Sequence, residues 1–552
     1  MLIKENRHIT MLTWILAAVL AAVSLSGYPH LAVYFDLSDE PYQIMCGWDY
    51  RSSVVAPLSA WFTSVVGAWV GYDMLPLRQI GWTFTLLSIL IGSLPVWWLT
   101  RKLNFTLVSA IIATGLASHC RLLEWMYGWD PLSALPATLA AVAAFRFVVR
   151  RGYAPVVTAA IFTAMATLMR LPSLAIAIAP IIAIFAPHGQ FKCKLRYFLT
   201  FVAILLACAL SGIIALYGSV ENYACYFGGN IINEHSPGHM ADEYLSHIVW
   251  VPFFLFFFAG TIFTANRVMT RGHMFANTLI FIILAAALSS MVFSWAKITW
   301  YALAPVTSVV ICALIFVIWK LRHHLRTRIG IYALLAAATM LSAAAGSNLL
   351  LYKSLTYQVL AVVITLVVFI ARSWRTVAGW TVVMSATAIY AAARNYDVIE
   401  PHNGTPPPCL PPKTTVDGMR HHDGLELDYC WTDLLQRMVD KFGPYADSPD
   451  YRTIVVRNTP RHFIYEYMFD ARNPAAPHYW AMDNLMDRPD YCRKIEHMAD
   501  TVTPPAAILL LQNASCHFDS EPELITRMKR RYRTVYSDST FTIVIKYANQ
   551  GK

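Results

Sequence analysis

The chain has 552 residues, of which 57% are hydrophobic and only 14% are charged. This balance is too apolar for a soluble protein and is typical of a polytopic membrane protein. The formal net charge of +10 does not indicate nucleic-acid binding, because no basic patch with interleaved aromatic residues is visible.

Apolar runs of span length recur along residues 1–393. Reading about 16 to 23 apolar residues as one span, we expect about thirteen helices. They lie near 11–33, 80–99, 105–120, 131–149, 154–169, 171–187, 197–218, 244–265, 274–294, 299–319, 329–351, 355–371 and 376–393. The fifth and sixth are short, which leaves a tight hairpin or a partly re-entrant pair open. The first resembles a signal peptide at its start, but it stays apolar through Tyr34, so we expect it to be retained.

Charged residues indicate the orientation of these helices. With a cytoplasmic N-terminus, most lysines and arginines before residue 394 fall at inside ends, as the positive-inside bias requires. The acids before that position sort oppositely, since all except Glu5 fall in outside loops. We therefore expect three outside loops to build one acidic face, and an odd number of spans to place the C-terminal part outside.

A Pro-rich segment over 394–415 is predicted to be a linker. It precedes a soluble extracytoplasmic α/β domain over 416–552, which has no span-length apolar run. There we expect buried strands at 453–457 and 507–512, a helix at 521–531, and a hairpin over 534–547 that turns near 537–540. Cys409, Cys430, Cys492 and Cys516 are able to pair if the compartment is oxidising, and pairing is left open. The predicted fold is mainly α, a polytopic helical bundle in the inner or plasma membrane with this small domain outside.

The first outside loop carries the strongest signal for chemistry. Residues 35–61 read FDLSDEPYQIMCGWDYRSSVVAPLSAW and place Asp36, Asp39, Glu40 and Asp49 at a membrane surface. Carboxylates beside a bilayer are costly to desolvate and do not anchor a helix, so this cluster is a functional-site hypothesis.

Five motifs in chain order resemble the lipid-linked-sugar glycosyltransferases of the GT-C superfamily. They are SDEPYQ, WDYRSSVVAPLSAW, LPLRQIGW, YGWDPLSALPATLA and ATLMRLPSLAIAIAP. Within that superfamily they are similar to the bacterial relatives of the protein O-mannosyltransferases and to the lipid A aminoarabinose transferase. One departure is that the family's His-Pro-Pro-Leu stands here as Ala56-Pro57-Leu58, which puts the acceptor preference in question.

The resemblance implies transfer of a sugar from a polyprenyl-phosphate donor to a lipid, glycan or protein acceptor on the outer face, with inversion. Because the leaving group is already a phosphate anion, one carboxylate that takes the hydroxyl proton suffices, while cations hold the phosphate. We assign Asp39 as this base, and Glu40 as its orienter or as a metal or acceptor contact. The alternative for the two residues is a solvated cap of a juxtamembrane helix.

Other residues are predicted to bind the substrates. Asp49 and Asp130 are candidates for the acceptor or the sugar, although Asp130 before a proline also suits a helix N-cap. Arg170 and Lys297, with Tyr301 beside the lysine, are the candidates for the donor phosphate. For Arg170 the alternative is a snorkelling side chain at a helix end.

No cofactor is certain, and a divalent metal is left open. His235 and His239 have the spacing of metal ligands, but Pro237 and Gly238 between them disfavour the helix that would align the rings. We expect this fourth outside loop to act as a lid over the lipid donor.

The competing functional class is a transporter or flippase of a lipid-linked or small-molecule substrate. Such proteins show internal repeats and discontinuous helices near mid-membrane, and the sequence shows no repeat. A third possibility is an inactive scaffold. Convergence of Asp39, Arg170 and Lys297 in one outward cavity would favour the transferase.

Overall fold

The computed structural model describes nine stretches of the chain and scattered positions within 11–22 and 103–111. The stretches are 39–53, 55–101, 127–228, 327–343, 415–425, 429–456, 463–471, 489–511 and 523–546. Lys297, Tyr301, the loop with His235 and His239, the linker and several predicted spans lie outside the described residues.

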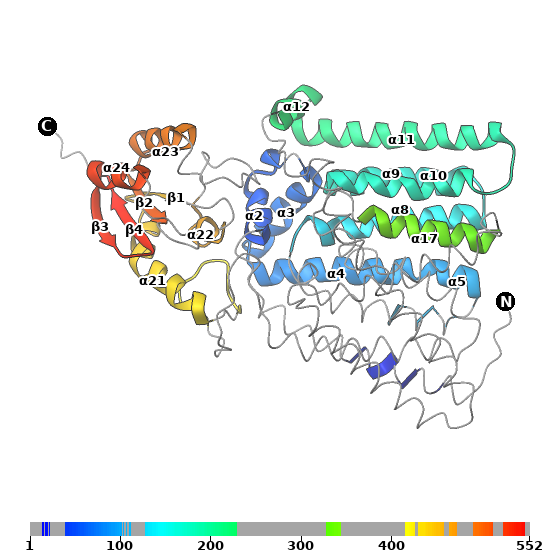
Figure 1. The fold of residues 1–552 in the computed structure, drawn as a ribbon, viewed down its shortest axis with the longest axis horizontal. Helices are drawn as coiled ribbons and strands as arrows, with labels where there is room; N and C mark the ends of the chain where they lie inside the picture. Colours follow the sequence, from blue (N-terminus) through cyan, green and yellow to red (C-terminus); the bar gives the residue numbers. More distant parts are fainter. Residues whose placement is uncertain are drawn as a thin grey trace, which may run out of the picture.

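Apolar helices of different lengths run along one another through the larger part of the molecule (Figure 1). They are α4 (Met74–Gly92), α5 (Leu94–Thr100), α8 (Trp129–Val149), α9 (Tyr153–Met169), α10 (Ile178–Phe185), α11 (Phe191–Tyr217) and α17 (Arg328–Ala343). Within the described stretches, Met74–Trp98, Trp129–Val149 and Phe191–Tyr217 are long and apolar enough to cross a membrane. The protein is thus a mainly helical, multi-pass membrane protein, as predicted, and the expected number of spans stays a prediction.

The two short segments around Arg170 form a tight hairpin. Helix α9 ends at Met169, and the chain continues as the 3₁₀-helix η3 (Leu171–Ala177) and then α10. The far ends of the two arms meet, because Arg151 Nη2 donates to the carbonyl of His188 at 2.5 Å. Arg170 lies at the tip of this hairpin, and both a spanning hairpin and a partly re-entrant pair are compatible with it.

The segment that we expected to be the first outside loop, as far as residue 79, is helical. It contains α2 (Asp39–Met45), the 3₁₀-helix η2 (Cys46–Ser52) and α3 (Pro57–Val70). Pro57 starts α3, where a proline costs no hydrogen bond, and Gly71 ends it with a left-handed φ of 71°. These elements, which we call the outer cap (residues 39–73), lie at the end of the bundle beside the C-terminal domain (Figure 1).

The C-terminal domain is built on a four-stranded mixed sheet of order β1-β2-β4-β3. The strands are β1 (Arg452–Val456), β2 (Ala506–Leu511), β3 (Arg533–Ser537) and β4 (Phe541–Ile545). β1 runs parallel to β2 in a register that aligns Ile454 with Ile508, and the other pairs are antiparallel. The two predicted strands and the terminal hairpin are confirmed, and the predicted helix is α24 (Glu523–Arg531).

Three helices of this domain were not predicted: α21 (Tyr429–Ala446), α22 (Ile464–Tyr467) and α23 (Pro489–Thr501). The sheet packs α23 and α24 on one face through Ile454, Ile508 and Val544. Its other face, with Val455, Leu509 and Ile543, packs on α21 and α22.

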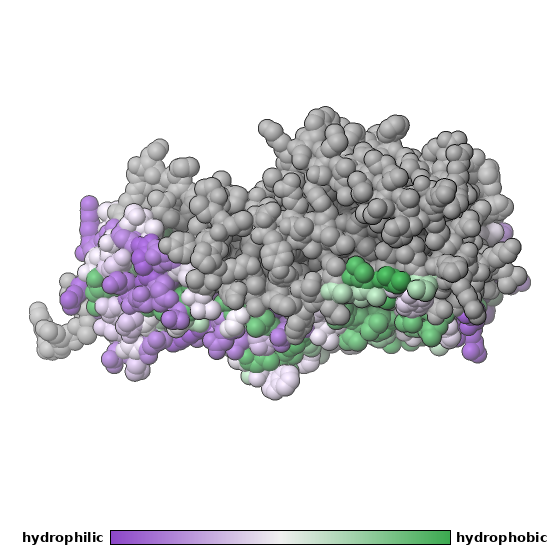
Figure 2. Space-filling view, turned by 90° about the horizontal axis from the view of Figure 1, so that it is seen from below, coloured by the Kyte–Doolittle hydropathy of each residue, from purple (hydrophilic) through white to green (hydrophobic). Residues whose placement is uncertain are grey.

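The second of these cores does not stop at the domain boundary. It continues through Met419 and Leu425 to Ile44 of the outer cap, and on to Met74 and Leu132 of the bundle. A shared apolar core of this kind holds the two parts together by the hydrophobic effect. Figure 2 shows the contrast between them, with hydrophobic residues over the bundle and hydrophilic ones over the domain.

Candidate functional site

The outer cap closes over the ends of three bundle helices. Leu171 N, at the tip of the hairpin, donates to the carbonyl of Val55 at 2.8 Å. The hydroxyl of Tyr217, at the end of α11, donates to the carbonyl of Ser53 at 3.1 Å. The chain that follows α2 and η2 is therefore fixed directly against Arg170 and its neighbours.

Arg170 and Asp130 form an ion pair at this junction. Arg170 Nε lies 2.7 Å from Asp130 Oδ1, and the side chains are 8% and 15% exposed, respectively. Arg170 ends α9 and is held inside the protein by this ion pair, which favours a role in the site over a snorkelling side chain. The N-cap alternative for Asp130 is wrong, because Gly128 occupies that position and Asp130 lies in the first turn of α8. A carboxylate in a first turn is favoured by the helix dipole.

Glu40 and Arg78 form a second ion pair, which is completely buried. Arg78 Nε donates to Glu40 Oε1 at 2.8 Å and Nη2 donates to Oε2 at 2.6 Å, with both side chains 0% exposed. Tyr127 N also donates to Glu40 Oε1, at 2.7 Å. Because both carboxylate oxygens are engaged, the geometry favours an orienting role for Glu40 over a metal or acceptor contact.

A third link joins the cap to the start of α8. Gln43 Oε1 accepts from Trp129 N at 2.7 Å, which satisfies one of the donors that the helix start leaves open. Gly128 permits this approach, since a Cβ there would lie 2.1 Å from Gln43 Oε1. Together, Glu40 and Gln43 fix α2 against the chain at 127–130.

Two further predicted site residues, Asp39 and Asp49, lie in the described part of the outer cap. Asp39 is the first residue of α2, and its side chain is outside the described ones. Asp49 lies exposed in η2. Convergence of Asp39 with Arg170 and Lys297 is therefore untested at the level of side chains.

The expected acidic face needs correction at three positions. Glu40 and Asp130 are paired with arginines, and Asp73 lies 3.7 Å from the ring of His421. Burial explains the difference, because a carboxylate removed from water needs a cation or hydrogen-bond donors. In the part of the chain that the structure describes, no group of three or more His, Cys, Asp or Glu side chains is arranged to hold a metal ion.

Sequence reasoning missed Arg78, Gln43 and the contacts of the C-terminal domain. Arg78 belongs to the quoted motif LPLRQIGW, but we assigned it to an outside loop. The available signal was that Arg78 follows the acidic segment and lies in an otherwise apolar helix, where a charge is rare. Nothing in the sequence indicated that His421 and Asp470 would reach the outer cap.

No family model and no curated protein matches the chain. Two solved structures are similar to it, both of ArnT from Cupriavidus metallidurans. The apo crystal structure has a TM-score of 0.42 and 12% identity, over 96% of this chain and 97% of that one. The structure bound to undecaprenyl phosphate has a TM-score of 0.43 and 10% identity, over 97% and 98%. The likeness spans nearly the full length of both chains and is loose.

Proposed function

We propose that this protein transfers a sugar from a polyprenyl-phosphate donor to an acceptor hydroxyl at the outer end of the bundle. The observation that carries the proposal is the Arg170–Asp130 ion pair at the tip of the hairpin, 2.7 Å long and mostly buried. The residue after Arg170 is bonded to the segment that follows Asp39, since Leu171 N donates to the carbonyl of Val55. The motif resemblance to lipid-linked-sugar transferases supports the same reaction.

The reaction needs one proton transfer and one displacement. Asp39 takes the proton of the acceptor hydroxyl as its oxygen attacks the anomeric carbon of the donor sugar. The bond between that carbon and the phosphate oxygen breaks, and the polyprenyl phosphate leaves with the electron pair and with inversion at the carbon. A positioned base contributes about 10²–10⁴-fold to such a step.

Arg170 is the proposed phosphate ligand. A guanidinium carries five N–H donors in a planar fork, and the ion pair with Asp130 engages Nε. Asp130 therefore fixes the direction of the fork. The low exposure of Arg170 strengthens its attraction to a phosphate, while the Asp130 carboxylate opposes that attraction in part. Lys297, Tyr301 and Asp49 remain proposed substrate contacts, and Glu40 orients α2.

Both parts of the site belong to one side of the membrane. Met74 N, which follows the outer cap, donates to the carbonyl of His421 at 3.0 Å, and this contact supports placing the outer cap and the C-terminal domain on one face. We propose the non-cytoplasmic face, because of the distribution of lysine and arginine. Reporter fusions after residue 45 and at the C-terminus should both report outside, and an inside signal from either would contradict the proposed topology.

The test uses purified full-length protein with two measurements: transfer from polyprenyl-phosphate sugars, and binding of undecaprenyl phosphate by native mass spectrometry. Asp39→Asn should lose transfer by about 10²–10⁴-fold and keep lipid binding. Arg170→Ala should lose lipid binding, and Arg170→Lys should restore part of it, because lysine lacks the planar fork.

Arg530→Ala is the matched control, since Arg530 is exposed in the last turn of α24, in the sheet domain. It should change neither measurement. Turnover of Asp39→Asn at the wild-type rate would remove Asp39 from the mechanism. Unchanged lipid binding by Arg170→Ala would move the phosphate site elsewhere.

A further inference from the structure

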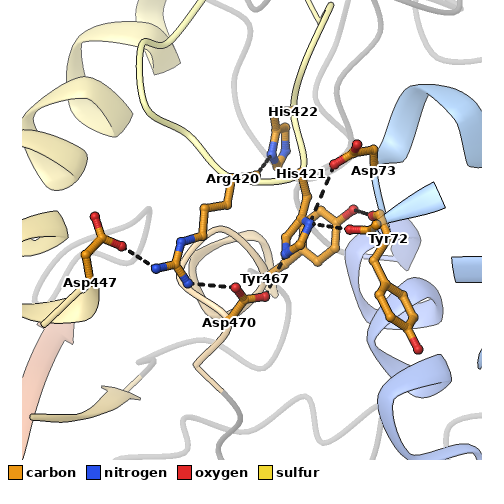
Figure 3. A network of polar contacts seen from close by, with 9 residues as sticks. Tyr72, Asp73, Arg420, His421, His422, Asp447, Tyr467 and Asp470 are labelled. Carbon is orange, nitrogen blue, oxygen red and sulfur yellow. Dashed lines mark hydrogen bonds and ion pairs between the residues drawn. The ribbon is translucent and has the colours of Figure 1, made fainter. Parts of the chain in front are cut away.

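One histidine of the C-terminal domain makes a polar contact with the outer cap, beside the shared apolar core. His421 Nδ1 lies 3.0 Å from the carbonyl oxygen of Gly71, and Nε2 lies 2.6 Å from Asp470 Oδ1 (Figure 3). Both partners are acceptors, so both ring nitrogens must donate. A neutral imidazole has one N–H, whereas the imidazolium has two. The contact is therefore complete only when His421 is protonated.

The charges around this ring favour its cationic form. Asp73, just before α4, lies 3.7 Å from Nδ1, and Asp423 is in the same loop as the histidine. Asp470, which follows α22, is shared with Arg420 at 2.7 Å, and Arg420 also pairs with Asp447 at the end of α21. Carboxylates thus approach the ring from the cap, through Asp73, and from the chain after α22, through Asp470. The guanidinium of the adjacent Arg420 is itself paired with Asp470 and Asp447.

The aromatic neighbours also fit a cation. Tyr467 stacks on His421 with ring centroids 5.0 Å apart and an interplanar angle of 29°. Trp48 of the outer cap stacks on the same tyrosine at 6.1 Å. The Tyr467 hydroxyl donates to the carbonyl of Tyr72, beside the histidine (Figure 3). Ring faces carry negative potential and attract a cation placed over them.

The backbone is strained at this contact. Tyr72, His421 and Asp470 have φ values of 59°, 63° and 50°, and Arg101 is the one other non-glycine residue with positive φ among those described. Such conformations persist only where the surrounding contacts hold them. Three of them at one contact indicate that its shape depends on the hydrogen bonds and ion pairs of His421 and on the stacking of Tyr467.

The titration of the ring agrees with this geometry. Burial lowers the pKa of His421, but the hydrogen bond and charge of Asp470, helped by Asp73 and the Gly71 carbonyl, outweigh it, so the pKa is raised. The neighbouring His422 is completely buried, and burial lowers its pKa to about 3. His422 therefore stays neutral, and His421 is the histidine of this loop that changes charge.

A series of hydrogen bonds through four residues connects His421 with the proposed site. The carbonyl of His421 accepts from Met74 N at 3.0 Å, which fixes the start of α4. One turn later on α4, Arg78 contacts Met74 Sδ at 3.3 Å and holds Glu40. Glu40 adjoins Asp39 in α2.

We propose that His421, as an imidazolium, is a positioning residue that clamps the outer cap to the C-terminal domain, and that raising the pH releases the clamp and weakens sugar transfer. The clamp depends only on the geometry above, whereas its effect on transfer rests on the proposed function. A raised pKa in the docked state means that the stabilisation is complete below the ordinary histidine value of about 6.5 and is lost as the pH rises through the raised value.

The test is amide hydrogen exchange of the 415–425 loop in the full-length protein, from about pH 6 to about pH 9. At each pH the exchange rate of wild type is divided by that of the variant. This ratio cancels the intrinsic pH dependence of exchange. His421→Asn removes the charge and keeps a residue that tolerates the left-handed backbone. Wild type should be better protected at low pH, and the difference should vanish at high pH. Each unit by which the pKa of His421 differs between the docked and the released loop corresponds to about a tenfold change in the docking equilibrium constant.

Asp470→Asn is the second variant, and asparagine again suits the backbone at that position. It should move the pH at which the loop opens to a lower value, because the main partner of the imidazolium is lost. His497→Asn, exposed on α23, is the matched control and should behave as wild type.

A loop whose exchange shows no such pH dependence in wild type, or a His421→Asn protein that keeps it, would overturn the clamp. Transfer measured over the same pH range separates the two proposals. A loop that opens with pH in a protein without transfer activity would sustain the clamp and refute the proposed function. Transfer whose pH profile is identical in wild type and His421→Asn would refute the link between them.

Discussion

The buried Glu40–Arg78 pair offers the sharpest test of how the outer cap is held. Arg78→Ala removes the cation from a carboxylate that is 0% exposed and receives two hydrogen bonds from it, at 2.8 and 2.6 Å. Removing one partner of a buried pair leaves the other charge uncompensated and costs about 3–5 kcal/mol. Protein stabilities are about 5–15 kcal/mol, so this single change should remove a large part of the total.

A double variant that removes both charges distinguishes the contribution of the ion pair from that of packing. Glu40→Leu with Arg78→Met replaces both charges by apolar groups, and such replacements are often close to neutral. The double variant should therefore be more stable than either Arg78→Ala or Glu40→Leu alone. The assay is thermal unfolding in detergent, followed by tryptophan fluorescence, together with a denaturant titration.

Arg530→Ala is again the control, because an exposed substitution of this kind changes stability by less than about 0.5 kcal/mol. If Arg78→Ala unfolded at the same temperature as this control, the pair would not hold the cap. If the double variant were less stable than both single variants, the charges themselves would be required, and the comparison with apolar replacements would be wrong.

Three further outcomes follow from the described contacts. Gly128→Ala should destabilise the protein by about 1–3 kcal/mol in the same unfolding assay, because its Cβ would meet Gln43 Oε1 at 2.1 Å, and wild-type stability would contradict that approach. Leu509→Ala, at a fully buried position of β2, should cost about 2–5 kcal/mol, and a cost below about 1 kcal/mol would show that the site collapses around the smaller side chain. Burial raises the pKa of Asp538, but hydrogen bonds from Thr540 and Phe541 outweigh it and lower the pKa. The stability that Asp538 contributes should therefore be present above the ordinary aspartate pKa and lost as the pH falls through the lowered value; a difference between wild type and Asp538→Ala that stayed constant down to strongly acidic pH would refute this.

The sequence predicted the elements that depend on local pattern. Apolar runs located the helices at 131–149 and 154–169 to within two residues of α8 and α9, because a membrane span must satisfy its own backbone and cover itself with apolar side chains. Short apolar runs and a polar turn located the strands of the C-terminal domain, because a buried strand has a distinctive composition. The acids near Asp39 and Asp130, and the isolated Arg170, also stood out, since charges are rare in such a chain.

Other features depended on the tertiary structure, because a charge signal does not name its partner. Glu40 pairs with Arg78 and Asp130 with Arg170, 38 and 40 positions away along the chain respectively. Neither spacing has a local periodicity. The pairings arise because the tertiary fold brings Glu40 of α2 to Arg78 of α4 and the hairpin tip to the start of α8. The helices of the outer cap were missed for a related reason. With 14 residues α3 is too short to read as a membrane span, and its residues Leu58, Phe62 and Val66 pack against a core that includes the bundle and the C-terminal domain.

The clamp at His421 shows the same limit most clearly. The histidine lies 350 positions from Gly71, whose carbonyl it contacts, and 49 from Asp470. Sequence alone predicted that a small domain with a sheet follows the membrane helices, which the structure confirms, while the gathering of the acids on one side stays a prediction. Only the folded chain decided which of these acids are neutralised, because ion pairs and hydrogen bonds act over a few ångströms in space whatever the separation along the chain.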